Sequence, residues 1–220
     1  MTEVRNYHFV ITNVCFNLTV LCYNLFNCEI RTALFLMQYD HLIFIGRFQP
    51  FHNGHKHVIE EGLKISRKMI ILCGSVNRKR SIKNPWTYKE RKLYISKSFS
   101  EAVLKRLYIS SLADYSDDVI WGKKVEEKVK KVVADNQKND IGIIGHQKDE
   151  TSYYLNLFPK WDIVKMKNFK NISGTHIRQE IFAAKNKQEV IDRIQNLVPN
   201  GVLLLLLDFF RDYHYKTNMI

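Results

Sequence analysis

The sequence has few cysteines, few acidic residues and no long apolar run. Its 4 Cys among 220 residues are too few, and too unevenly placed, for a disulfide scaffold. Asparagines interrupt each candidate window of about 20 apolar residues near the N-terminus, so no transmembrane helix is expected. The shares of hydrophobic residues (45%) and charged residues (25%) exclude a disordered, collagen-like or repeat-dominated chain. The length suits one α/β domain with a small appendage.

Residues 1–36 lack lysine altogether and differ in composition from the remainder. They hold three of the four cysteines, and their two glutamates cancel their two arginines, so the net charge of +12 belongs to residues 37–220. We expect 1–36 to be an extension outside the folded domain, with Met37 as the natural start of translation. A targeting or membrane segment and a genuine accessory element are the alternatives.

The deficit of acidic residues raises the question of a nucleic-acid partner. Lys plus Arg is 34 and Asp plus Glu is 22. The basic residues are scattered over several expected elements, including the clusters 78–80 and 128–131, and no nucleic-acid-binding motif occurs. Nucleic-acid binding is therefore kept only as the alternative from another functional class.

Short apolar runs alternate with longer helical patterns from residue 37 onward. Strands are expected at 42–46, 69–73, 107–110, 141–145 and 162–166. Helices are expected at 55–67, 87–100, 119–136, 174–184 and 187–197. This order predicts a Rossmann-like parallel sheet with helices on both faces over 37–200, followed by a C-terminal helix within 201–220. Ligands then bind at the carboxyl ends of the strands.

The loop after the first expected strand carries a phosphate-binding pattern. Gly46 and Gly54 permit close approach of the backbone, and a helix start offers free N–H groups and a positive dipole end. His52 and His55 can donate to one anion, and Arg47 lies in the same loop. A zinc site is the alternative, but no cysteine or carboxylate lies nearby in the sequence to complete one.

A second anion-binding pattern, Ile172-Ser-Gly-Thr-His-Ile-Arg178, follows the last expected strand and opens a helix. Ser173 can cap this helix and Thr175 can contact phosphate. Arg178 supplies a permanent forked cation for the β- and γ-phosphates of a nucleotide.

These two motifs resemble the His-x-Gly-His and Ile-Ser-Gly-Thr-x-Ile-Arg elements of the nucleotidyltransferase superfamily. The stretches 46–52 and 83–91 are similar to nicotinamide mononucleotide (NMN) adenylyltransferases of the archaeal type. The stretch 145–161 resembles bacterial bifunctional enzymes that join this activity to a Nudix hydrolase. The sequence contains no Nudix box, so hydrolase activity is not expected, and 201–220 resembles the start of the linker to that hydrolase.

The resemblance implies that ATP and NMN give NAD and pyrophosphate in the cytoplasm. The NMN phosphate would attack the α-phosphate of ATP in line. Mg²⁺ would be coordinated mainly by the ATP phosphates and water, because the sequence shows no cluster of acidic residues that could bind the metal. ATP and NMN are then the binding partners, and binding to nucleic acid or to a membrane is not expected. The resemblance is compatible with a homo-oligomer. Another cytidylyl- or adenylyltransferase, or an inactive remnant, is the alternative.

The site residues implied by motif and resemblance fall into three groups. The catalytic residues are His52, His55 and Arg178. The ATP-binding residues are Gly46, Arg47, Phe48, Gly54, Gly145, His146, Ser173, Thr175 and Arg178. The NMN-binding residues are Trp121, Trp86, Asn84, Asp114 and Arg91. Packing roles are the alternative for both tryptophans, and a turn or cap role is the alternative for Asp114.

Overall fold

The computed structural model describes residues 37–133, 140–146, 150–167 and 169–217. Residues 1–36 lie outside this range, so the expectation that they are an extension remains a prediction. From Tyr39 onward the chain forms one compact unit. None of the helices in the described ranges is long and apolar enough to cross a membrane.

A five-stranded, all-parallel sheet forms the centre of this unit. Its strands are β1 (Tyr39–Gly46), β2 (Ser66–Cys73), β3 (Leu107–Ser111), β4 (Ile141–His146) and β5 (Asp162–Met166). They lie in the order β3-β2-β1-β4-β5. The expected α/β, Rossmann-like architecture is confirmed.

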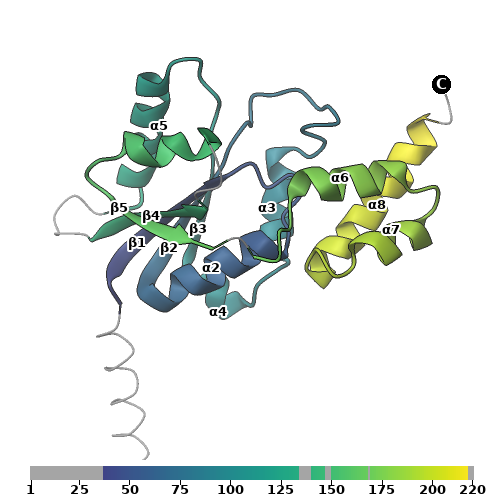
Figure 1. Ribbon diagram of the computed structural model, residues 1–220, viewed down its shortest axis with the longest axis horizontal. Coiled ribbons are helices and arrows are strands. Elements are labelled where there is room, and N and C mark those ends of the chain that lie inside the picture. The colour runs from purple at the N-terminus through teal and green to yellow at the C-terminus, as the bar shows by residue number, and fades with distance from the viewer. Residues whose placement is uncertain (1–36, 134–139, 147–149, 168, 218–220) are drawn as a thin grey trace, which may run out of the picture. The chain divides into compact units, whose positions relative to one another are not determined.

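Helices connect the strands and continue the chain beyond β5. They are α2 (Asn53–Ile65), α3 (Tyr88–Ser96), α4 (Glu101–Leu104), α5 (Asp118–Lys130), the 3₁₀ segment η1 (Glu150–Leu157), α6 (Gly174–Ala183), α7 (Lys187–Ile194) and α8 (Asn200–Thr217). The last three gather beside α3 (Figure 1).

Alternating side chains of β1, β2 and β4 build two cores, one on each face of the sheet. Leu42 and Phe44 of β1 enter the core that packs against α2, α3 and α6 to α8. Ile43 and Ile45 enter the other core, which packs against α5 and the segment after β4. Both faces are covered, which explains why β1 and β2 read as continuous apolar runs.

The middle of the sheet contains the topological switch point. After β1 the chain crosses to the face covered by α2, and after β4 it continues into η1 on the opposite face. The carboxyl ends of β1 and β4 are therefore the place where a sheet of this topology binds its ligand.

Some boundaries differ from the sequence expectation for local reasons. The helix expected at 55–67 ends at Ile65, since Ser66 is extended and its hydroxyl donates to the Gly62 carbonyl. The helix expected at 87–100 is α3 and ends at Ser96, because the backbone N–H of Ser98 turns back to the Ile95 carbonyl. The short helix α4 that follows was not expected. The 3₁₀ segment η1 was not expected.

Candidate active site

The loop between β1 and α2 adopts an unusual backbone course. Phe48 has a φ of 52° and the Gln49–Pro50 peptide is cis. The Phe48 ring is 1% exposed and folds back over Gly46, where a Cβ would lie 2.9 Å from its Cζ. Glycine is therefore required at position 46 by the ring of Phe48.

His52 and His55 cap the start of α2 reciprocally. The backbone N–H of His55 donates to Nδ1 of His52 (3.4 Å), and the backbone N–H of His52 donates to Nδ1 of His55 (3.3 Å). The rings stack with centroids 3.6 Å apart and planes at 22°. Because each Nδ1 accepts, each neutral ring carries its hydrogen on Nε2. The pair therefore places two imidazoles beside the positive end of α2.

The second motif lies against the first. Ser173 caps α6 by accepting from the backbone N–H of His176 (3.2 Å). Arg178 is 7% exposed, and its Nη1 donates to the Gln49 carbonyl (2.6 Å) while Nη2 donates to Thr175 Oγ1 (3.1 Å). A Cβ on Gly174 would lie 2.7 Å from the Gln49 oxygen, so only glycine permits this approach. Two motifs far apart in the sequence thus form one site.

Gln49 is a site residue that the sequence reasoning did not single out. It is 3% exposed, its side-chain amide donates to the Trp86 carbonyl (2.8 Å), and its side-chain oxygen accepts from the Trp86 N–H (3.1 Å). Its backbone carbonyl receives Arg178. Gln49 therefore ties the loop after β1 to the segment before α3.

Three arginines converge on the same loop. Arg47 is exposed, whereas Arg91 and Arg178 are buried. Burial lowers the pKa of both buried guanidinium groups, and the charge of Arg47 lowers each pKa further. Within the described residues neither buried guanidinium bonds a carboxylate. The site is consequently positive and suited to an anion.

Trp121 and Trp86 have different surroundings. Trp121, in the first turns of α5, is half-buried and lies edge-on to Tyr154, with centroids 5.9 Å apart. Trp86 is 1% exposed and packs on Tyr94 and Phe209. An indole enclosed in this way has no face exposed to a ligand ring. Trp86 therefore fits the packing role, and we do not propose that it stacks on NMN.

The remaining NMN candidates act within the protein in this structure. Asp114 accepts from Ser75 Oγ (3.1 Å) and from Arg78 Nε (2.9 Å), so it joins the loops after β2 and β3. Asn84 closes a short bridge with Ser81. Arg91 donates to backbone carbonyls beneath the loops, where it is 1% exposed. Asp114 and Arg91 therefore hold neighbouring loops together.

The candidates after β4 are only partly described. Gly145 ends the buried part of the strand at its carboxyl end, and a Cβ there would meet Leu155 and the Tyr154 hydroxyl at an ordinary 3.6 Å. The backbone of His146 pairs with Met166, while its side chain lies outside the described residues.

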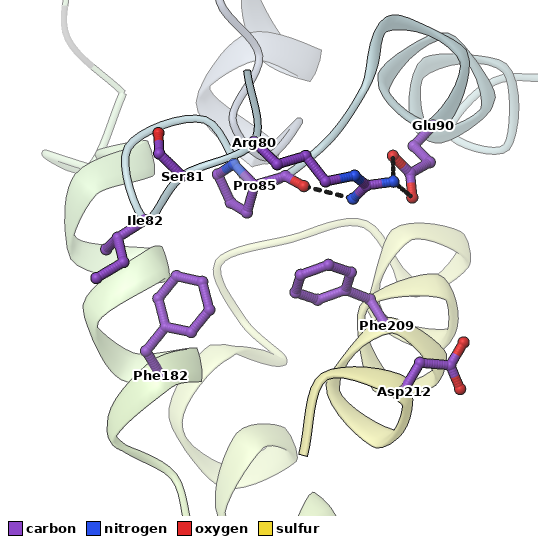
Figure 2. A pocket seen from close by; sticks show the side chains of 8 residues that line it. All are labelled: Arg80, Ser81, Ile82, Pro85, Glu90, Phe182, Phe209 and Asp212. Carbon is purple, nitrogen blue, oxygen red and sulfur yellow. Dashed lines mark hydrogen bonds and ion pairs between the residues drawn. The ribbon is translucent and has the colours of Figure 1, made fainter. Parts of the chain in front are cut away.

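A cavity of about 470 Å³ lies between the segment before α3 and the helices α6 and α8, and no residue of the two motifs is among those that line it (Figure 2). Phe182 and Phe209 face each other across it. Arg80 on its rim donates to the Pro85 carbonyl and pairs with Glu90. The Glu90 carboxylate offsets the charge of Arg80, so this part of the rim lacks the unneutralised cation of the Arg178 site.

Comparisons with known proteins agree with this geometry. The sequence model of the family described as cytidylyltransferase-like matches residues 43–180. A nicotinamide/nicotinic acid mononucleotide adenylyltransferase of Acinetobacter baylyi is 35% identical over 82% of this chain and 92% of its own length. A nicotinamide-nucleotide adenylyltransferase of Picrophilus torridus is 27% identical over 70% of this chain and 87% of its own.

A solved structure gives the same picture. The bifunctional NMN adenylyltransferase/ADP ribose pyrophosphatase of Francisella tularensis, complexed with AMP and a manganese ion, superposes with a TM-score of 0.64 at 34% identity. The match covers 82% of this chain and 53% of the Francisella chain. This chain therefore spans about half the length of that bifunctional enzyme.

Proposed function

We propose, from the premise that this chain belongs to the cytidylyltransferase-like family, that it transfers the adenylyl group of ATP to NMN, giving NAD and pyrophosphate. The names of the Acinetobacter and Picrophilus relatives, each matched over most of its length, support the activity. The proposal concerns adenylyl transfer alone, and hydrolase activity is no part of it.

One observation carries the proposal: the carbonyl of Gln49 joins the histidine motif to the guanidinium of Arg178 at the switch point. This contact places two helix N-termini, α2 and α6, beside the same loop. Helix N-termini and guanidinium groups are the protein's strongest ligands for phosphate. A triphosphate therefore fits here better than an uncharged ligand.

The chemistry needs electrostatic stabilisation more than a protein nucleophile. A phosphate monoester has its second pKa near ~6, so the NMN phosphate is mostly dianionic at neutral pH and can attack by itself. The Nε2–H groups of His52 and His55 would meet negative charge at the α-phosphate as the new bond forms. Arg178 would hold the β- and γ-phosphates and stabilise the departing pyrophosphate.

We propose MgATP as the nucleotide substrate. Among the described residues no three His, Cys, Asp or Glu side chains gather as ligands for a metal ion. The donors present are cationic or N–H groups, which suit the phosphates rather than the metal. Mg²⁺ would therefore be held by phosphate oxygens and water, neutralising charge on the triphosphate.

The nicotinamide ring of NMN is assigned to Trp121. The indole lies in the first turns of α5, after β3, and a half-buried indole face suits a cationic pyridinium. The proposal places the reaction in the cytoplasm, with ATP and NMN as the partners. A homo-oligomer stays a prediction.

The experiment is an NAD-formation assay with ATP, Mg²⁺ and NMN. CTP replaces ATP, and pantetheine phosphate or glycerol phosphate replaces NMN, in parallel reactions. NAD formation with ATP and NMN alone is the expected result, and nicotinic acid mononucleotide measures the preference at the ring. Turnover only with CTP or with another phosphate acceptor would assign the chain to a different transferase.

A further inference from the structure

Arg91 is a buried cation held by backbone oxygens. Its Nη1 donates to the carbonyl of Arg47 and to that of Gly74 (2.7 Å), and its Nε donates to the Thr87 carbonyl (3.3 Å). Arg47 lies directly after β1, and Gly74 directly after β2. One terminal nitrogen thus connects the two adjacent loops at the carboxyl end of the sheet.

Each of these two carbonyls precedes a residue in the left-handed region. Phe48 follows Arg47 with a φ of 52°, and Ser75 follows Gly74 with a φ of 57°. Left-handed backbone is unfavourable for residues with a side chain, and it persists where surrounding contacts enforce it. The bonds from Arg91 fix the peptide that enters each of these two turns.

Fixing those peptides also orients their N–H groups. In a trans peptide the N–H points opposite to the C=O. Because the carbonyls of Arg47 and Gly74 point inward to Arg91, the N–H groups of Phe48 and Ser75 point away from it. The loops are further joined by the Gly74 N–H, which donates to the Gly46 carbonyl (2.9 Å).

We propose that Arg91 is a positioning residue for adenylyl transfer, which holds the turns after β1 and β2 so that their N–H groups face the substrate phosphates. The proposal rests on the function proposed above. Arg91 acts through the backbone, without touching substrate, in contrast to the NMN-binding role inferred from resemblance. Together with Arg178 on the Gln49 carbonyl, it fixes alternate carbonyls of the loop that carries Phe48.

Arg106 provides a matched control at the other end of the sheet. It precedes β3, and its guanidinium donates to the carbonyls of Leu63 (2.7 Å), Ser66 (2.6 Å) and Arg67 (2.9 Å). Ser66 and Arg67 begin β2, at the end of the sheet opposite to the histidine motif. Both arginines tie backbone carbonyls together, but only one does so at the site.

The test compares Arg91→Met, Arg91→Lys and Arg106→Met with the wild-type chain. For each we would measure the melting temperature, the stoichiometry of ATP binding by calorimetry, and kcat and KM for both substrates. Misplacing reacting groups by about 1 Å can cost on the order of 10²-fold in rate. We expect Arg91→Met to bind ATP at full stoichiometry with kcat lowered by roughly 10²-fold.

The control variants separate positioning from stability. Arg91→Lys keeps a cation that can reach one carbonyl, so it should recover part of kcat. Arg106→Met should lose melting temperature and keep kcat within about twofold. Wild-type kcat in Arg91→Met, or an equal loss of kcat in Arg106→Met, would overturn the positioning role. Failure of the wild-type chain to make NAD would instead overturn the proposed function.

If Arg91→Met does not fold, Arg91→Lys alone decides the question. A folded Arg91→Lys with full ATP stoichiometry and reduced kcat supports positioning. A folded Arg91→Lys with wild-type kcat, KM and melting temperature contradicts it, because its ammonium cannot reproduce three directed N–H bonds.

Discussion

The two histidines of α2 show how a capping interaction also prepares a chemical group. The Nδ1 atoms of both imidazoles accept the bonds that start the helix, and in the proposed mechanism the same rings donate through Nε2–H to the substrate. The stacked rings then restrict both imidazoles to one orientation. The local structure and the proposed chemistry therefore depend on the same two side chains.

His55→Ala should mainly lower kcat. Its Nε2–H is proposed to meet charge that develops in the transition state, and removal of such a donor costs roughly 10²–10³ in rate. KM for ATP and NMN should change far less, because Arg178 and the helix N-termini also hold the triphosphate. The measurement is steady-state NAD synthesis, with circular dichroism to confirm folding.

The control for this change is His57→Ala. His57 lies on the same helix but stacks on Phe169 and faces Glu61, so it should keep kcat. Folded His55→Ala protein with near wild-type kcat would remove the histidine motif from the mechanism.

Trp121→Ala should affect NMN more than ATP. Loss of about 1–2 kcal/mol of stacking and cation–π energy raises KM for NMN by about tenfold. Trp161 is the matched control, since it stacks on Phe158 within the same aromatic cluster but precedes β5, at the amino end of the sheet. If Trp121→Ala and Trp161→Ala raised KM for NMN equally, Trp121 would have only a packing role.

At the scale of elements, the N-cap of α5 fixes the orientation of the proposed nicotinamide platform. The Asp117 carboxylate accepts from the backbone N–H groups of Val119 (2.7 Å) and Ile120 (2.9 Å). The next residue is Trp121, whose own N–H donates to the Asp117 carbonyl (2.9 Å). The Asp117 cap therefore stabilises the first helical turn of α5, which carries the Trp121 side chain.

Asp117→Ala should destabilise the protein by about 1 kcal/mol and also raise KM for NMN, because the first turn of α5 loses its cap. Asn186→Ala removes a similar cap from α7, where Asn186 accepts from the Glu189 N–H (3.0 Å). It should show a comparable loss in urea denaturation with KM unchanged. The same change in KM for both variants would argue that the cap acts only through global stability.

Most elements could be predicted from the sequence because apolar periodicity and caps are local signals. Thr87 and Glu90 form the expected capping box at the start of α3. The paired motifs were predictable as well, since each combines glycine with a helix start. The inward course of Arg91 was not predicted, because arginine is ordinarily exposed. The available signal was its spacing: Arg91 precedes Tyr94 and Ile95 by three and four residues, which puts it on the same buried face of α3.

Other features depended on contacts between distant segments. Phe48 adopts a left-handed φ that no local pattern favours, and Gln49 is a hydrogen-bonding centre only because Trp86 and Arg178 come to it. Trp86 is buried because α8 supplies Phe209. Tertiary packing determined these positions, so the sequence could name the residues without assigning their partners.

At the scale of the whole molecule, buried acids that stay protonated should make the fold sensitive to alkali. Burial raises the pKa of the Cys73 thiol from 9.0 to about 12, and burial also raises the pKa of Tyr94 and Tyr154 above 10.0. The folded state then holds protons that the unfolded state releases. This stability is fully present below about pH 9 and falls as pH rises toward 12.

The slope from Cys73 alone is about 1.4 kcal/mol per pH unit within that window. Urea denaturation midpoints at several pH values between about 8 and 10.5 would measure it. Cys73→Ala should decline less steeply than wild type over the same range. A midpoint that does not change with pH would contradict this prediction.

Removal of residues 1–36 should leave the enzyme intact. Residues 1–36 contain no lysine, and their composition differs from that of residues 37–220. A protein that starts at Met37 should therefore keep its melting temperature and its turnover, measured by calorimetry and NAD synthesis. A large loss of either would show that the first 36 residues contribute to the fold or to the site.

The strand order has a consequence for synthesis of the chain on the ribosome. Strand β1 lies between β2 and β4, and Leu42 pairs with Gly142, so its second neighbour is translated long after the first. Until that segment emerges, β1 is the open edge of a nascent three-stranded sheet, the kind of edge that recruits chaperones or aggregates. The contact of Arg178 with Gln49 forms later still, so the two motifs meet only after all five strands have been translated.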